Sequence, residues 1–248
     1  MALKRVPVDK KKTERVAAAK AKLPTSMAQD KLLAPNAKLP DLAYEQIEEA
    51  IVTLRIPPGT SVSELTLSKA TGIGRTPIRE AIQRLARENL IFILPQRGLL
   101  VPQIDVSKQL RLLEMRREIE RLVCRSAAKR ASPAQRESFA RLAGEFTTAG
   151  DANDDVSFIR SDREFNELCL QSAHNEFTEG AMRLMNGLSR RFWYYHYKQA
   201  ADLPEIAKLH AALSSAIADA DVAGAASACD RLIDNIEAFT RSTVMTNI

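Results

Sequence analysis

Residues 72–81 read GIGRTPIREA, and this stretch decides the architecture of the first third of the chain. Thr76 is of a residue type that caps helices, and Pro77 suits the first helical position, so we expect a helix to begin here. Three aliphatic residues then recur at helical spacing and predict one buried face: Ile78, Ile82 and Leu85. The stretch therefore predicts a tight turn followed by an amphipathic helix.

The other face of this helix is polar. Arg79 and Gln83 lie away from the aliphatic stripe, and Arg75 precedes them at the turn. Guanidinium and amide groups hydrogen-bond phosphates and base edges. A helix that is anchored on one side and basic on the other is therefore suited to a DNA groove, although a solvated surface helix is the alternative.

The segment before this helix predicts two more helices. Residues 41–55 carry apolar side chains at helical spacing and are followed by the helix-stopping IPPG at 56–59. Residues 63–71 predict a short second helix, and Gly72 can end it in the left-handed conformation that glycine adopts at low cost. Three short helices in this order predict a helix-turn-helix.

The segment after the helix predicts a β-hairpin. Residues 90–94 (LIFIL) are too few for a helix and favour a strand, PQRG at 95–98 predicts a turn, and LLV at 99–101 returns. Arg97 and Gly98 occupy the tip. A winged helix-turn-helix uses such a tip to reach phosphates or the minor groove beside the reading helix.

The composition fits a DNA-binding protein of about two domains. The chain has 248 residues, 45% of them hydrophobic, and no apolar run approaches the roughly 18 residues that span a membrane. Three cysteines without a CxxC pair indicate neither a disulfide framework nor a thiolate zinc site, so we expect them to be buried. We expect a cytoplasmic protein with no membrane partner.

The positive charge is concentrated in the leader, residues 1–40. This segment holds ten Lys or Arg against three acids, which is +7, and the chain as a whole carries +5, so the remainder carries 5 − 7 = −2. A lysine-rich and alanine-rich segment without aromatic residues buries little surface, and we expect it to be disordered. It is either a solvated tail or an arm that strengthens DNA binding at low salt.

The rest of the chain predicts a mainly α protein. We assign residues 41–103 to the winged helix-turn-helix domain and residues 104–248 to an all-helical domain. Its expected helices are 107–131, 133–149, 154–173, 175–200, 204–219 and 221–243.

Three polar residues interrupt the apolar stripes of these helices: Arg116, Asp162 and His210. Unpaired polar groups are costly to bury, so the three must be paired with one another, hydrated or waiting for a ligand. A structural ion-pair network, such as Arg116 with Asp162 or Glu120, is the plainer interpretation.

Residues 41–102 resemble the DNA-binding half of the GntR family of bacterial transcription regulators. The similarity rests on Pro58-Gly59, on residues 72–81 and on the wing at 95–101. It implies DNA contacts by Arg75, Thr76 and Arg79 on the recognition helix and by Arg97 and Gly98 on the wing. The polar face of the helix adds Gln83 to these predicted contacts. Gly74 stands where the family usually has a serine, so one phosphate-contacting hydroxyl is missing.

Residues 107–243 resemble the FCD effector-binding domain of the FadR subfamily. The similar positions are EMR at 114–116, DREFN at 162–166, and His210. The resemblance implies an effector site formed by Arg116, Asp162, Asn166 and His210. It also implies a divalent metal, zinc or nickel, held by Asp162, Asn166 and His210, in a set that is incomplete because Asn166 and Leu232 replace two histidines.

The resemblance implies a homodimeric, ligand-responsive repressor. We expect it to bind a palindromic operator in double-stranded DNA and to be released by a small organic acid whose carboxylate pairs with Arg116. We do not expect an enzyme. An effector-free DNA-binding protein with a relic ligand site, and an enzyme built on the bundle with Asp162 and His210 as acid and base, are the alternatives.

Overall fold

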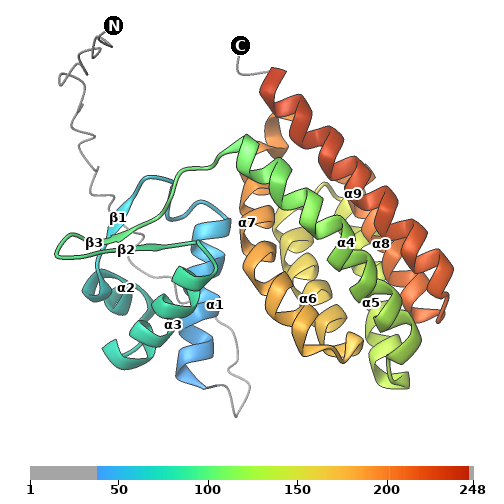
Figure 1. The fold of residues 1–248 in the computed structure, drawn as a ribbon, viewed down its shortest axis with the longest axis horizontal. Coiled ribbons are helices and arrows are strands. Elements are labelled where there is room, and N and C mark those ends of the chain that lie inside the picture. The colour runs from blue at the N-terminus through green and yellow to red at the C-terminus, as the bar shows by residue number, and fades with distance from the viewer. Residues whose placement is uncertain (1–37, 201, 246–248) are drawn as a thin grey trace, which may run out of the picture.

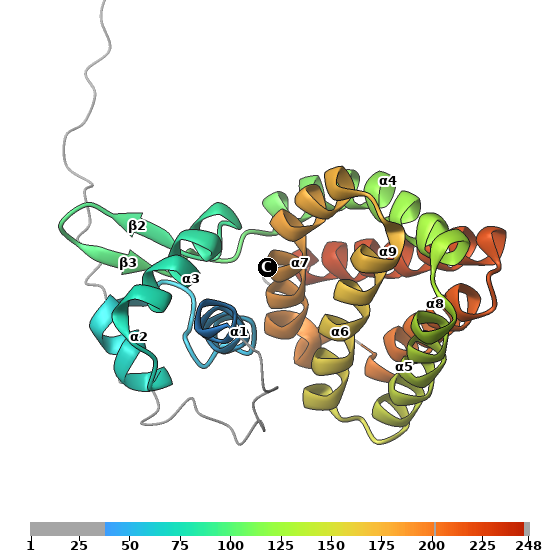
Figure 2. The same ribbon diagram turned by 90° about the horizontal axis from the view of Figure 1, so that it is seen from below.

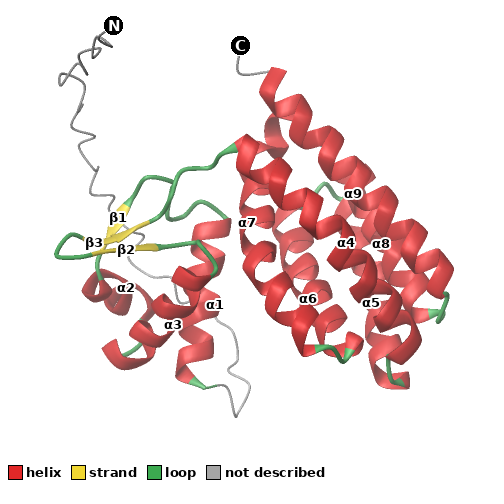
Figure 3. Ribbon diagram, in the orientation of Figure 1, coloured by secondary structure: helices red, strands yellow, loops and turns green. Residues whose placement is uncertain are grey.

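The computed structural model describes residues 38–200 and 202–245, which within those ranges form nine helices and one small sheet. Figure 3 shows the strands gathered at one corner of an otherwise helical molecule. The mainly α architecture, with a winged helix-turn-helix before a helical bundle, is confirmed. The predicted disorder and DNA-binding role of the leader concern residues that lie almost entirely outside the described part of the chain.

Three helices form the N-terminal domain: α1 (Leu39–Val52), α2 (Glu64–Thr71) and α3 (Arg75–Arg87). The first helix begins earlier than predicted and stops at Val52, because Leu54 takes a left-handed φ of 59°. Gly72 ends α2 with a φ of 72°, as the sequence predicted.

The start of the recognition helix corrects one prediction. Thr76 does not cap α3 and Pro77 is not its first residue. The extended residue Gly74 precedes the helix, which begins at Arg75, so Pro77 is the third residue. Proline is tolerated there because the amides of the first turn have no partner within the helix. The hydroxyl of Thr76 is consequently not used in capping.

The wing is an antiparallel sheet of three short strands: β1 (Ser61–Val62), β2 (Phe92–Leu94) and β3 (Gly98–Leu100). Their order is β1-β3-β2, and Leu99 stands opposite both Val62 and Ile93. The hairpin of β2 and β3 was predicted. Strand β1 was not, because two residues are too few to show an alternating pattern.

Six helices form the C-terminal domain, and their boundaries agree with the predicted ones to within two residues. They are α4 (Val106–Arg130), α5 (Pro133–Asp151), α6 (Asp155–Ala173), α7 (Glu176–Ala200), α8 (Leu203–Ala218) and α9 (Val222–Met245). The core contains the fully buried Phe139, Phe146 and Phe165, which meet edge to face. The three cysteines are buried and free, as expected.

Helices α1 and α7 join the two domains. Figures 1 and 2 show α1 lying between the wing and the bundle, with α7 as its nearest bundle helix. Val52 packs with the core of the bundle, and Leu188 of α7 packs against the core of the N-terminal domain. This apolar contact packs the α7 side of the bundle against the N-terminal domain (Figure 1).

Candidate nucleic-acid interface and effector cavity

The recognition helix presents one exposed polar face. Arg75, Arg79 and Gln83 follow at i, i+4 and i+8, and all three are exposed. Arg79 pairs with Glu64 of α2 at 2.7 Å, although its side chain remains 65% exposed. Exposed pairs of this kind contribute about 0–1 kcal/mol. A DNA phosphate can therefore compete for the Arg79 guanidinium at little cost.

The wing extends a second basic group beside this helix. Arg97 and Gly98 are exposed in the turn between β2 and β3, and the Arg97 amide donates to the Leu94 carbonyl at 3.0 Å. Gly98 has a φ of 89°, and a Cβ there would lie 3.0 Å from the Val62 carbonyl. Both constraints favour glycine at this position. The six predicted DNA contacts are thus all exposed, Thr76 included.

The four residues nominated for effector binding meet in one cavity inside the bundle. Arg116 enters from α4, Asp162 and Asn166 from α6, and His210 from α8. The cavity measures about 40 Å³. Further lining residues come from α6, α7, α8 and α9: Phe158, Ile159, Asn186, Ser189, Arg190, Trp193, Ile206 and Ile236. The α9 residue at the wall is Ile236, one turn beyond the Leu232 that the family resemblance had indicated.

Arg116 is fully paired within the cavity wall. Its Nε donates to Glu120 at 2.8 Å, its Nη2 lies 2.6 Å from the same carboxylate, and its Nη1 donates to the hydroxyl of Ser189. Burial alone would lower the pKa of Arg116, but Glu120 outweighs it and the pKa rises. The sequence suggested Asp162 or Glu120 as the partner of Arg116, and Glu120 makes the direct ion pair.

Asp162 is the centre of a second buried cluster. Its Oδ2 lies 3.0 Å from Nε of Arg190 and its Oδ1 lies 3.3 Å from Nε2 of His210. The amide nitrogen of Asn166 also donates to Oδ1 at 3.0 Å. Burial would raise the pKa of Asp162, but His210 and the two neighbouring guanidiniums, Arg190 and Arg116, hold it below its ordinary value. Asp162 is therefore a stabilised carboxylate.

His210 faces two hydrogen-bond acceptors. Its Nδ1 lies 2.8 Å from the carbonyl of Ile206, and its Nε2 faces Asp162. The rings of Phe146 and Phe158 pack on the imidazole at centroid distances of 5.0 and 5.2 Å and keep it in place.

The residues implied for a metal do not fit one. Asp162, Asn166 and His210 do meet, but Asn166 turns its N–H toward Asp162 and Arg190 occupies the other carboxylate oxygen. Two guanidiniums in the wall would repel a cation. Within residues 38–200 and 202–245, no group of three or more His, Cys, Asp or Glu side chains could hold a metal ion.

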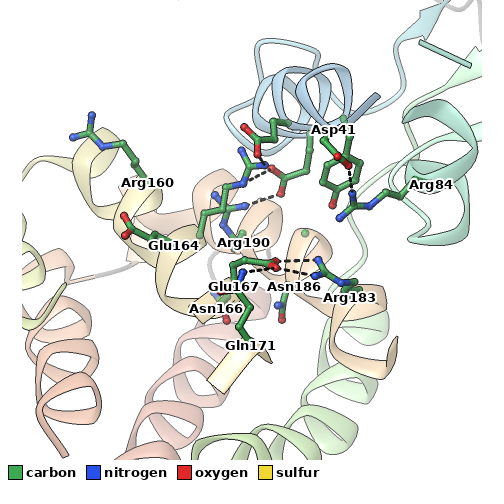
Figure 4. Close-up of a pocket in the computed structure, with 15 residues that line it drawn as sticks. Asp41, Arg84, Arg160, Glu164, Asn166, Glu167, Gln171, Arg183, Asn186 and Arg190 are labelled. Carbon is green, nitrogen blue, oxygen red and sulfur yellow. Dashed lines mark hydrogen bonds and ion pairs between the residues drawn. The ribbon is translucent and has the colours of Figure 1, made fainter. Parts of the chain in front are cut away.

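A larger cleft lies on the other side of Arg190, between α1 and the bundle. It measures about 720 Å³ and shares three lining residues with the inner cavity: Asn166, Asn186 and Arg190. Figure 4 shows the cleft, with Asp41 and Arg84 of the N-terminal domain facing residues of α6 and α7. Asn166, Asn186 and Arg190 therefore form the partition between the inner cavity and this cleft.

Sequence reasoning missed the contribution of α7. Asn186, Ser189 and Arg190 line the cavity, and Arg190 also reaches the N-terminal domain. The spacing that drew attention to Arg116 would have found two of them, because Met182, Asn186, Ser189 and Trp193 follow at i, i+4, i+7 and i+11.

The exposed basic helix, the wing and the buried charged cavity define a class of protein, a winged-helix DNA-binding regulator with a helical regulatory domain. Comparison with known families places the chain within this class. Residues 39–101 match the family described as bacterial regulatory proteins, gntR family, and residues 111–235 match the FCD domain. The protein is therefore a GntR-family regulator with a C-terminal FCD domain, the architecture found in the FadR-like subfamily.

Individual relatives are similar over most of their length. The HTH-type transcriptional repressor RspR of Escherichia coli is 26% identical over 189 residues, which cover 76% of this chain and 83% of the relative. An HTH-type transcriptional regulator from the TAR-I ttuE-ttuC' intergenic region of Agrobacterium vitis is 29% identical over 53% of this chain and 78% of the relative. Among solved structures, E. coli McbR/YncC has the same fold, with a TM-score of 0.72 at 18% identity, over 84% of this chain and 100% of the other.

The described helices include none that is long and apolar enough to cross a membrane. The families that match are transcriptional regulators rather than enzymes.

Proposed function

We propose that this chain is a homodimeric repressor that binds a palindromic operator through α3 and the wing and is released by a small organic acid in the bundle. The observation that carries the DNA-binding half is the exposed face of Arg75, Arg79 and Gln83, with Arg97 on the adjacent wing. Phosphate contacts orient such a domain and base contacts select the sequence. A two-fold dimer then matches a palindrome, and DNA binding associates the protein with the nucleoid.

The acid class of the effector follows from the cavity. Arg116 and Arg190 line the cavity with planar guanidiniums. The buried Oδ1 of Asn186 has no hydrogen-bond partner and is an acceptor, so it favours a donor group, such as a hydroxyl, on the same ligand. Guanidinium groups pair with carboxylates in a bidentate geometry. Apolar walls from Phe158, Trp193 and other residues favour an acid with a short carbon skeleton.

The test is a gel-shift titration on duplex DNA from the region upstream of the protein's own gene, followed by footprinting. We expect a protected site with two related halves about one helical turn apart and one dimer bound per site. Binding only to unrelated DNA, with the same affinity for a scrambled duplex, would contradict the proposal. Carboxylates are then added to the preformed complex, and release of the duplex is expected.

A second candidate is an effector-free regulator whose ligand site is a relic. The small volume of the inner cavity, about 40 Å³, favours it, because such a space holds only a few water molecules. Thermal unfolding with a panel of carboxylates separates the two candidates, since a ligand that binds the folded state raises its melting temperature.

Catalysis in the bundle has no comparable support. The hydroxyl of Ser189 accepts hydrogen bonds from Gln109 and Arg116, and His210 is held by Ile206 and Asp162. Neither arrangement pairs a nucleophile with a free general base. We therefore assign the cavity to binding.

A further inference from the structure

The polar contact between the two domains ends inside the effector cavity. Glu48 of α1 belongs to the N-terminal domain, which we call the reading domain because it carries α3 and the wing. Its side chain is only 4% exposed, and it accepts a hydrogen bond from Nη1 of Arg190 at 2.6 Å. The Nε of the same guanidinium faces Asp162 at 3.0 Å, and its Nη2 donates to the Ile159 carbonyl at 3.0 Å. One arginine therefore connects the cavity to the reading domain.

The buried cluster has no free cation for an incoming acid. Two guanidiniums, Arg116 and Arg190, face three buried carboxylates, Glu120, Asp162 and Glu48. The three carboxylates therefore already outnumber the two guanidiniums. Arg163 approaches Glu48 only at 3.9 Å and is a quarter exposed. A fourth buried carboxylate would be unpaired, which is costly, so it must displace one already present.

Only one of the three carboxylates can leave without disturbing the bundle. Glu120 lies one turn from Arg116 on the same helix, and Asp162 is held by His210 and Asn166 within the bundle. Glu48 belongs to the other domain, and its contacts with Arg190 and Arg163 both cross the interface. Its displacement costs the bundle no internal contact.

The sizes of the inner cavity and the neighbouring cleft also favour displacement of Glu48 from Arg190. The inner cavity of about 40 Å³ is too small for an organic acid, but Arg190, Asn166 and Asn186 separate it from a cleft of about 720 Å³. Movement of the Arg190 side chain away from Glu48 would join the two spaces. Entry of the acid and loss of the interdomain ion pair are then the same event.

We propose that Arg190 is an effector-binding residue that exchanges its carboxylate partner: an organic acid takes the guanidinium from Glu48 and so breaks the buried ion pair between the reading domain and the bundle. This inference rests on the proposed function and adds the route from cavity to DNA. It requires that Glu48 and the acid compete for the guanidinium of Arg190. A variant that lacks the Glu48 carboxylate should therefore bind the acid more tightly.

The chain contains a built-in reporter for the test. Trp193 is its single tryptophan and lines the inner cavity. Acetate, malonate, succinate and benzoate are titrated against the full-length protein, and the fluorescence of Trp193 reports binding. Hydrogen exchange of the α1 amides reports whether the reading domain separates from α7.

We compare Glu48→Gln with the control Glu45→Gln, which lies on the same helix but has a side chain that is 45% exposed and only a 3.6 Å approach to Arg163. We expect Glu48→Gln to lower the Kd of the bound acid about fivefold or more and Glu45→Gln to change it less than twofold. Saturating acid is expected to speed exchange in α1 of the wild type. Arg190→Gln, if it folds, is expected to lose acid binding.

An unchanged or weaker affinity in Glu48→Gln, or α1 exchange that does not respond to bound acid, would overturn the inference. Loss of all Trp193 response in both the wild type and Glu48→Gln would overturn it together with the acid-effector half of the proposed function. The gel shift on operator DNA tests the DNA-binding half separately, so the two failures are distinguishable.

Discussion

The reading domain and the bundle carry their polar side chains in opposite ways. On α3, Arg75, Arg79 and Gln83 are exposed and come from one short stretch of sequence. Around the effector cavity, the charged side chains are buried and paired with one another, and the pair between Arg190 and Glu48 joins residues 142 positions apart. Exposed groups bind a large partner from solvent, whereas buried pairs bind nothing until one partner is displaced. The first arrangement suits recognition and the second suits control.

The largest expected effect is on DNA binding. The double variant Arg75→Ala/Arg79→Ala should weaken operator affinity by about a hundredfold, because each guanidinium contact with a base or phosphate contributes about 1–3 kcal/mol. Gel-shift titration measures it. Arg125→Ala/Lys129→Ala, which removes the same charge from exposed positions of α4, is the control. Equal losses in both variants would mean that only net charge matters.

The next largest expected effect is a loss of folding stability in the variant Arg190→Met. Removal of this guanidinium leaves Glu48 and Asp162 without their partner, and loss of one member of a buried pair costs about 3–5 kcal/mol. The free energy of unfolding, measured in denaturant, should fall by that amount. The second variant Glu48→Leu/Arg190→Met should recover part of it. No loss in Arg190→Met would show that water already solvates the cluster.

Arg191 is a buried cation whose removal should stabilise the chain, in contrast to the removal of Arg190. Arg191 is 3% exposed, no other described residue bonds its Nε or Nη1, and burial lowers its pKa to about 10. The pKa of Arg191 is lower in the folded chain than in the unfolded chain. Keeping its guanidinium charged below about pH 10 therefore costs free energy on folding. Arg191→Met should therefore raise the free energy of unfolding at pH 7 by about 1–3 kcal/mol.

Arg183→Met is the control for this experiment, since Arg183 is bridged by Glu167 and Glu179 and should stabilise the chain. The comparison is made by thermal unfolding of the two variants side by side. A loss of stability in Arg191→Met would indicate that a second subunit supplies a partner to the guanidinium.

Acid should destabilise the bundle through Asp162. Its folded pKa lies below its ordinary value, so its contribution is present above about pH 4 and is lost as the pH falls through the folded pKa. Between about pH 6 and about pH 3, on both sides of the ordinary aspartate pKa of about 4, the free energy of unfolding should fall more steeply in the wild type than in Asp162→Asn. The difference in slope is at most about 1.4 kcal/mol per pH unit. Glu164→Gln, at an exposed position of the same helix, should retain the wild-type slope.

The smallest effect is expected from metal. Nickel or zinc should change the melting temperature by less than about 1 °C, because Arg190 and Asn166 occupy the carboxylate that a metal would need. In the variant Asn166→His/Ile236→His, two imidazoles join Asp162 and His210, and the same ions should raise the melting temperature. A clear shift in the wild type would contradict our description of the site.

Local pattern determined much of this protein. Residues 72–101 specify the turn, the recognition helix and the wing, because glycine, proline and helical spacing act over a few neighbouring residues. The six bundle helices were also predictable from periodicity and their Pro, Gly and Asp boundaries. Exposure of Arg75, Arg79 and Arg97 followed from the same local rule, since a helix or hairpin with one buried face must show the other to solvent.

The tertiary structure decided the cavity and its partners. Nothing local to Glu48 or Arg190 indicates that the two would meet, because helix packing alone brings α1 against α7. Periodicity placed Arg116, Asp162 and His210 on inward faces, but it could not assign their pairs, since a side-chain contact depends on the rotation and register of two helices at once. Sequence determines which face of a helix is buried, and only the packed fold determines what that face touches.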